Sequence, residues 1–241
     1  MRNIFAAVVL LFIISSGVSG QQALLQEGLA LKYLVRLPAD GSKHPPLIIL
    51  LHGYGSDEKD LFELRTSLPA SYMIIAARAP YALPGGGYQW YDISATSKGK
   101  GDIKRENING QRDQIIQFIS QVAHKYKADS SAVYLIGFSQ GAIMSYEVGL
   151  YAPDKVKGIG VLSGRLYESL KPVIKNTPAL KKLKIFIAHG TADNRIPFVD
   201  GKAANDYLTG IGLKPDFHQY SGMSHTISND VMNDLLKWLN K

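Results

Sequence analysis

The chain has 241 residues, of which 46% are hydrophobic and 20% charged, and this composition excludes a disordered, collagen-like or coiled-coil protein. It contains no cysteine, which excludes disulfides, a thiolate nucleophile and cysteine-ligated metal centres. The formal net charge is +7, but the basic residues are scattered and accompany no nucleic-acid-binding motif. We therefore expect a globular protein that does not bind nucleic acid.

Residues 1–20 are predicted to form a secretory signal peptide. Arg2 precedes an unbroken apolar run over residues 4–14, which is too short to span a bilayer, and small residues follow as far as Gly20. Cleavage after Gly20 would leave a single domain, residues 21–241, without a stable membrane span and exported to the periplasm or the medium. The alternative is an uncleaved N-terminal anchor.

The rest of the chain alternates predicted strands and helices. Short apolar runs predict strands at residues 29–37, 47–51, 72–77, 132–137, 156–162, 184–188 and 217–220. Apolar residues at helical spacing predict helices at residues 57–67, 106–127, 140–151, 199–211 and 226–241. This alternation indicates an α/β fold, with a mostly parallel central sheet covered by helices on both faces. A long loop over residues 81–105 is expected to shape the substrate side.

A G-x-S-x-G pattern, Gly137-Phe138-Ser139-Gln140-Gly141, directly follows a predicted strand and opens a predicted helix. This context is typical of a nucleophile elbow, a tight turn that needs small residues at both glycine positions. The turn would place the Ser139 hydroxyl at a helix N-terminus, where developing negative charge is favoured. Ser139 is therefore predicted to be the nucleophile. The alternative is a capping serine in a glycine-bounded turn.

A serine hydroxyl needs a base that accepts its proton, and in hydrolases with such an elbow the acid and then the histidine follow the serine. His225 lies in a Gly/Ser loop between the last predicted strand and the last predicted helix, so we predict that it is the base. His218 is the alternative, although it lies within a predicted strand. His189 precedes the candidate acid, so its position in the chain order is wrong.

Asp193 is the predicted acid of this triad. It follows the strand predicted over residues 184–188, at the carboxyl end where α/β sheets place their sites. Its carboxylate would orient the His225 imidazole and stabilise the charged form of the ring. Asp200 and Asp206 are later alternatives, but both fall in or near a predicted helix.

Two backbone amides are predicted to form an oxyanion hole. One is the N–H of Gln140, the residue after the nucleophile, and the other is the N–H of Tyr54 in the glycine-containing loop after an early strand. His52 opens that loop and is expected to brace it structurally, because it precedes Ser139 in the chain.

Five short motifs follow one another along residues 29–241. They are His52-Gly53-Tyr54-Gly55-Ser56-Asp57, Trp90-Tyr91-Asp92, Gly137-Phe138-Ser139-Gln140-Gly141, His189-Gly190-Thr191-Ala192-Asp193 with Ile196-Pro197, and Gly222-Met223-Ser224-His225. Together they resemble the phospholipase/carboxylesterase family of α/β-hydrolases, which includes acyl-protein thioesterases. The resemblance implies the α/β-hydrolase fold, the triad and the oxyanion hole named above.

The resemblance also implies a substrate-binding role for Trp90, Tyr91 and Asp92, since a Trp-Phe-Asp element lines the site entrance in this family. Tyr91 replaces the phenylalanine of that element, and Tyr54 stands where many relatives have leucine, which would narrow or polarise the acyl site. The predicted export signal is a further departure, because the relatives known as protein depalmitoylases are cytosolic.

These observations predict a serine carboxylesterase that hydrolyses short- to medium-chain acyl esters through an acyl-enzyme intermediate. No metal or cofactor is expected, the partner is a small-molecule or glycan ester, and the protein is expected to be a monomer or homodimer. No inserted helical lid is visible in the sequence, which favours accessible esters. The alternatives are an exported polysaccharide acyl or feruloyl esterase, an acyl-protein thioesterase, a serine peptidase, and a catalytically inactive binding protein.

Overall fold

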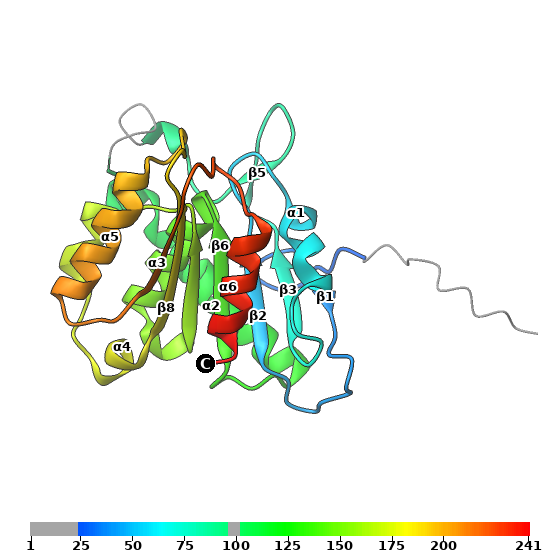
Figure 1. Ribbon diagram of the computed structural model, residues 1–241. Helices are drawn as coiled ribbons and strands as arrows, with labels where there is room; N and C mark the ends of the chain where they lie inside the picture. The colour runs from blue at the N-terminus through cyan, green and yellow to red at the C-terminus, as the bar shows by residue number, and fades with distance from the viewer. Residues whose placement is uncertain (1–23, 96–101) are drawn as a thin grey trace, which may run out of the picture.

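The computed structural model describes residues 24–95 and 102–241 (Figure 1). The predicted signal peptide, residues 1–20, lies outside the described residues, as does part of the loop predicted over residues 81–105. Within the described ranges, no helix combines the length and the apolar character that crossing a membrane requires.

A seven-stranded sheet forms the centre of the described structure (Figure 1). Its order is β1-β3-β2-β6-β7-β8-β9; β1 pairs with β3 antiparallel, and all other neighbouring strands are parallel. The strands are Tyr33–Arg36 (β1), Leu47–Leu51 (β2), Met73–Ala77 (β3), Val133–Phe138 (β6), Gly158–Leu162 (β7), Lys184–Gly190 (β8) and Asp216–Tyr220 (β9). Strands β2, β3 and β7 are buried along their whole length, as their continuous apolar runs predict.

Helices cover both faces of this sheet and enclose two hydrophobic cores. Residues of α2, α3 and α5 belong to the core on one face, and residues of α1 and α6 belong to the core on the other face (Figure 1). The helices are Glu58–Phe62 (α1), Asn109–Tyr126 (α2), Gln140–Tyr151 (α3), Pro178–Lys182 (α4), Phe198–Gly210 (α5) and Asn229–Leu239 (α6). The predicted α/β fold with a mostly parallel sheet is confirmed, and the described part of the chain contains no large lid.

The predicted elements differ from the observed ones mainly at their ends. The strand predicted over residues 29–37 is shorter, because Gln26 and Tyr33 form a bridge and the residues between them turn. The helix predicted over residues 57–67 divides into α1 and a 3-10 helix, Glu63–Thr66. The core strands and α3 have the positions that the sequence predicts.

A short hairpin follows β3, inside the segment predicted to be a long loop. Strands Tyr81–Ala82 (β4) and Tyr88–Gln89 (β5) pair antiparallel, and Gly86 and Gly87 in the turn between them have positive φ angles of 95° and 74°. Strands of two residues are too short to produce a periodic pattern, so the sequence does not reveal them. The hairpin leads directly into Trp90.

The turn between β6 and α3 depends on two glycines. A β-carbon at Gly137 would overlap the backbone of Gly141, and a β-carbon at Gly141 would overlap the carbonyl of Leu51 in β2. Helix α3 therefore starts closer to the sheet than any larger residue would allow. This close approach determines where Ser139, between the two glycines, stands above the carboxyl ends of the parallel strands.

We predict that Gly141→Ala destabilises the fold by about 1–3 kcal/mol or prevents folding, because the new methyl group meets backbone atoms that cannot rotate away. Gly110→Ala is the matched control. Gly110 lies in α2, and a β-carbon there has no neighbour within 4 Å, so this variant should be as stable as the wild type or up to about 1 kcal/mol more stable. Urea denaturation measures both effects. Equal stability of the two variants would contradict the close approach of α3 to the sheet.

Candidate active site

Ser139 lies in a strained turn at the start of α3. Its φ of 55° is positive and its ψ is −115°, a sparsely populated combination that costs a non-glycine residue about 1–3 kcal/mol. The backbone N–H of Ser139 donates to the Leu162 carbonyl of β7 at 2.9 Å. The hydroxyl consequently stands at the N-terminus of α3, where the helix dipole stabilises negative charge.

Asp193 and His225 form a short hydrogen bond beside this turn. The distance from Asp193 Oδ2 to His225 Nδ1 is 2.7 Å, and the Asp193 side chain is fully buried. The other carboxylate oxygen accepts hydrogen bonds from the N–H groups of Arg195 and Ile196, each at 2.9 Å. Because Nδ1 faces a carboxylate, it carries the ring proton, and Nε2 is left to accept a proton. The Phe138 ring packs on His225 with centroids 4.8 Å apart.

The alternative acids are paired elsewhere. Asp200 forms an ion pair with Arg165 at 2.9 Å, and Asp206 forms one with Lys202 at 2.6 Å. Neither carboxylate is bonded to a histidine in the part of the chain that the structure describes. The structure therefore brings Asp193, and not these two residues, to His225.

The other two late histidines have different surroundings. His218 lies in β9, where its Nε2 is 2.9 Å from Asp216 Oδ1. His189 is completely buried at the end of β8, its Nε2 donates to the Ile196 carbonyl at 2.8 Å, and it lies 3.5 Å behind the Asp193 carboxylate. Burial lowers the pKa of His189, so this ring is neutral and supports the turn that holds Asp193.

The loop after β2 is braced by His52, as its sequence position predicts. His52 Nδ1 donates to the Gly53 carbonyl at 2.7 Å, and Nε2 accepts the Ala79 N–H at 3.0 Å. Burial lowers the pKa of His52, which keeps the ring in the neutral form that these two bonds require. A β-carbon at Gly53 would be 3.4 Å from the Ser139 β-carbon, so this loop, which continues into Tyr54, lies directly beside the nucleophile turn.

The Gln140 side chain connects the nucleophile turn to the segment after β5. Its Oε1 accepts the Trp90 N–H at 2.8 Å, and its Nε2 donates to the Tyr91 carbonyl at 2.8 Å. The backbone N–H of Gln140 is the first of α3, and the first N–H groups of a helix have no intrahelical acceptor. The Gln140 side chain therefore fastens the segment after β5 to the start of α3.

Trp90 and Asp92 do not occupy the positions expected of substrate-contacting residues. Trp90 is fully buried, and its indole N–H donates to the His52 carbonyl at 2.9 Å. This bond supports the loop after β2. Asp92 is exposed and accepts hydrogen bonds from Ser94. Of the three motif residues, Tyr91 lines the cavity that Ser139 and His225 share. The motif identifies the segment, but the direction of each side chain depends on packing.

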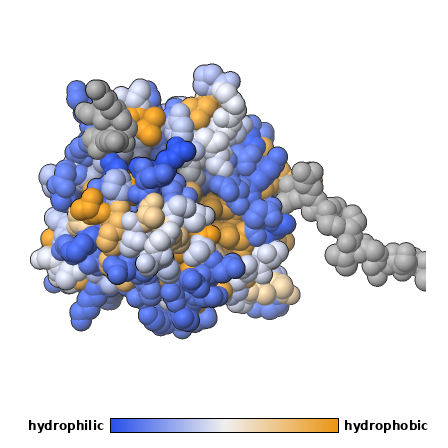
Figure 2. Space-filling view, turned by 45° about the horizontal axis from the view of Figure 1, so that its top comes forward, coloured by the Kyte–Doolittle hydropathy of each residue, from blue (hydrophilic) through white to orange (hydrophobic). Residues whose placement is uncertain are grey.

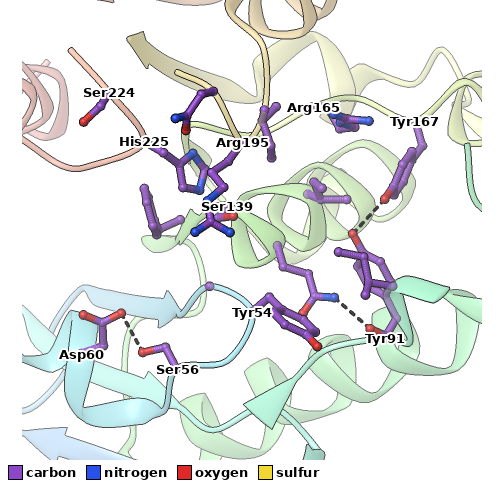
Figure 3. A pocket seen from close by; sticks show the side chains of 17 residues that line it. Tyr54, Ser56, Asp60, Tyr91, Ser139, Arg165, Tyr167, Arg195, Ser224 and His225 are labelled. Carbon is purple, nitrogen blue, oxygen red and sulfur yellow. Dashed lines mark hydrogen bonds between the residues drawn. The ribbon is translucent and has the colours of Figure 1, made fainter. Parts of the chain in front are cut away.

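Ser139 and His225 open into one cavity of about 720 Å³ (Figure 3). Its apolar and aromatic lining comprises Tyr54, Tyr91, Ile93, Phe138, Ile143, Tyr167 and Ile196. The Tyr91 and Tyr167 hydroxyls are 3.0 Å apart, and burial raises the pKa of both phenols, so both remain neutral. The volume falls within the usual range for a small-molecule site.

The cavity also contains charged residues that the motifs do not indicate. Arg165 and Arg195 line it on one side, and Asp60 lines it on another (Figure 3). Arg165 lies in the loop after β7. That loop matches none of the five motifs, so the sequence does not indicate that Arg165 lines this cavity. Within the described ranges, no group of three His, Asp or Glu residues is arranged to hold a metal ion.

Comparisons with known proteins identify the family of this chain. The family model of the phospholipase/carboxylesterases matches residues 35–241. The chain is 30% identical to acyl-protein thioesterase 1 of Mycosarcoma maydis over 88% of this chain and 97% of that protein, and 29% identical to the Yarrowia lipolytica thioesterase over 85% and 95%. The chain therefore belongs to the phospholipase/carboxylesterase family of α/β-hydrolases and is a serine ester hydrolase.

Solved structures support the same fold. The esterase PE8 is 26% identical with a TM-score of 0.72, and the match covers 86% of this chain and 96% of that chain. A carboxylesterase from Mesorhizobium loti is 21% identical with a TM-score of 0.76, and the match covers 90% of this chain and 98% of that chain.

We predict that Gln140→Ala lowers the free energy of unfolding by about 1–3 kcal/mol, because it leaves the Trp90 N–H and the Tyr91 carbonyl buried without partners. Gln117→Ala, at an exposed position of α2, is the matched control and should change stability little. Chemical denaturation of both variants measures the difference. If Gln140→Ala is as stable as the control, the side chain does not fasten this segment.

Proposed function

We propose that this protein hydrolyses carboxylic esters with Ser139 as nucleophile, His225 as base and Asp193 as the acid that orients the base. The observation that carries the proposal is the arrangement of Ser139, His225 and Asp193. Ser139 occupies a strained turn at a helix N-terminus, in the same cavity as a histidine whose Nδ1 is 2.7 Å from a fully buried carboxylate. These are the positions and roles that nucleophilic ester hydrolysis requires.

In the first half-reaction, Ser139 Oγ attacks the ester carbonyl while His225 Nε2 accepts the hydroxyl proton. The negative charge of the tetrahedral intermediate lies on the former carbonyl oxygen, toward which the backbone N–H groups of Gln140 and Tyr54 are proposed to donate. The carbon–oxygen bond to the alcohol then breaks, and His225 returns the proton to the departing alcohol. The product is an acyl-serine at Ser139.

In the second half-reaction, water replaces the alcohol. His225 takes a proton from the water, the resulting hydroxide attacks the acyl-serine, and the intermediate collapses to release the acid and restore the Ser139 hydroxyl. Asp193 stays bonded to His225 Nδ1 throughout and stabilises the positive ring that forms twice in each cycle. These residues perform every proton transfer of the cycle.

The proposed substrates are short- to medium-chain acyl esters that are accessible from water. A cavity of about 720 Å³ with aromatic walls and several polar groups suits an ester of this size. In Figure 2, where the top of Figure 1 comes forward, hydrophilic residues predominate and hydrophobic residues form small separate patches. Such a face favours dissolved esters over a lipid surface, which requires a broad apolar patch.

We further propose that the protein is exported after cleavage of residues 1–20. The support is the sequence alone: a positive residue, an apolar run too short for a bilayer, and small residues before Gln21.

The triad predicts the outcome of a pair of histidine substitutions. His225→Ala should reduce kcat/KM for p-nitrophenyl butyrate by about 10⁴-fold, because no other group can accept the Ser139 proton. His218→Ala is the matched control, since this ring is bonded to Asp216 in β9, and its activity should change little. A fluorophosphonate probe should label Ser139 in the wild type, and mass spectrometry of the labelled peptide identifies the residue. Labelling of another serine, or the opposite ranking of the two variants, would contradict the proposed triad.

The export proposal predicts that the mature protein begins at or near Gln21. Intact mass spectrometry of the protein recovered from the medium or periplasm of its native host measures this. An exported protein that still carries Met1 would contradict cleavage of a signal peptide.

A further inference from the structure

Two arginine side chains reach the cavity of Ser139 from neighbouring loops. Arg165 lies in the loop after β7, and Arg195 lies in the loop between β8 and α5. Strands β7 and β8 are adjacent and parallel, so both loops start at the same edge of the sheet. Figure 3 shows both arginines on the upper side of the cavity, the side that also carries His225.

Arg165 is a positioned cation. Its guanidinium forms an ion pair with Asp200 at 2.9 Å, and its side chain is 12% exposed. Burial raises the pKa of the Tyr91 and Tyr167 phenols, and the positive charge of Arg165 opposes that rise, which reflects its closeness to both hydroxyls. The guanidinium is thus held by Asp200 close to the Tyr91 and Tyr167 hydroxyls of the cavity.

The backbone of Arg195 is held by a hydrogen bond, and the residue is exposed. Its N–H donates to Asp193 Oδ1 at 2.9 Å, so the side chain starts from a fixed point two residues from the proposed acid. Every Asp and Glu of the sequence lies within residues 24–95 and 102–241, and none of them forms an ion pair with Arg195. A guanidinium in a cavity without a carboxylate partner can donate hydrogen bonds to an anionic group of the substrate.

The opposite side of the cavity carries a negative charge. Asp60 lines it there and accepts a hydrogen bond from Ser56 Oγ at 2.8 Å (Figure 3). A substrate anion is repelled from this side and attracted to the two arginines, which fixes its direction in the cavity. The net charge is +7 for the full sequence, or +6 once Arg2 is removed with residues 1–20, and it adds a long-range attraction for anionic molecules.

We propose that the preferred substrate is an ester that carries an anionic group, a carboxylate or a phosphate, bound by Arg195 and Arg165. The proposal rests on the proposed function, because it concerns the substrate of the same Ser139 site. The anion does not take part in the reaction. Its ion pair with the guanidinium groups holds the ester carbonyl in place beside Ser139.

Two pairs of substrates test the proposal, and within each pair the two esters have acyl chains of the same length and differ in the anionic group. The carboxylate pair is the mono-p-nitrophenyl ester of adipic acid and p-nitrophenyl hexanoate. The phosphate pair is 1-butyrylglycerol 3-phosphate and 1-butyrylglycerol. The measured quantity is the ratio of kcat/KM for the charged ester to kcat/KM for its neutral partner. Since each ratio is taken within one variant, a general loss of activity cancels.

For the wild type we expect a ratio of about ten in at least one pair, the size of effect that one charge-assisted hydrogen bond produces. Arg195→Gln should bring that ratio close to one, and Arg195→Lys should retain part of it. Raising the salt concentration should lower the wild-type ratio by screening the charges. Lys202→Gln is the control that removes an exposed positive charge from α5, where Lys202 pairs with Asp206, and it should leave the ratio unchanged.

Arg165→Lys keeps a partner for Asp200 and tests the second arginine without leaving a carboxylate unpaired. We expect Arg165→Lys to lower the ratio, because a lysine cannot form the bidentate hydrogen bonds of a guanidinium. The pair that shows the preference identifies the anion as carboxylate or phosphate.

Two results would overturn the proposal and leave the proposed function intact. The first is a wild-type ratio of one or less in both pairs, and the second is an unchanged ratio in Arg195→Gln. In both cases the neutral esters are hydrolysed and the fluorophosphonate labels Ser139. If no ester is hydrolysed and Ser139 is not labelled, the proposed function itself is wrong, and the anion subsite is overturned with it.

Discussion

The absence of β-carbons at Gly137 and Gly141 is the constraint on which the rest of the site depends. These two positions lie against backbone atoms of each other and of β2, and the tight turn that they allow from β6 into α3 leaves Ser139 with a positive φ of 55°. The strain is local, and the fully buried β2 and the buried face of α3 hold it in place. The geometry that we propose for catalysis thus follows from how closely a helix can approach a parallel sheet.

A second set of contacts attaches the neighbouring loops to this turn. Gln140 bonds to the backbone at Trp90 and Tyr91, and Trp90 in turn bonds to the carbonyl of His52. Each bond is short and buried, so the nucleophile turn, the segment after β5 and the loop after β2 form one connected unit. In a dry environment such bonds are costly to leave unmade, which is why the loops retain their relative positions without a disulfide.

The sequence predicts the centre of this structure better than its periphery. Residues 47–51 and 140–151 coincide with β2 and α3, because continuous apolar runs and the elbow glycines constrain them on both sides. The hairpin before Trp90 is missed, since its strands have two residues each. The buried position of Trp90 is missed for another reason: a motif defines an order of residues, and the direction of a side chain is decided by long-range packing.

The turn after β8 carries both the proposed acid, Asp193, and Arg195 of the proposed anion site. Asp193 is fully buried and its carboxylate accepts three hydrogen bonds, one from His225 and two from the N–H groups of Arg195 and Ile196. Losing any of the three would leave a buried charge undersatisfied, so the backbone of this segment must keep its conformation for the proposed triad to persist. The same conformation fixes the point from which the Arg195 side chain leaves the backbone. An anion bound by that guanidinium would therefore be positioned by the very bonds that hold the acid, and substrate selection and proton transfer would share a single rigid support.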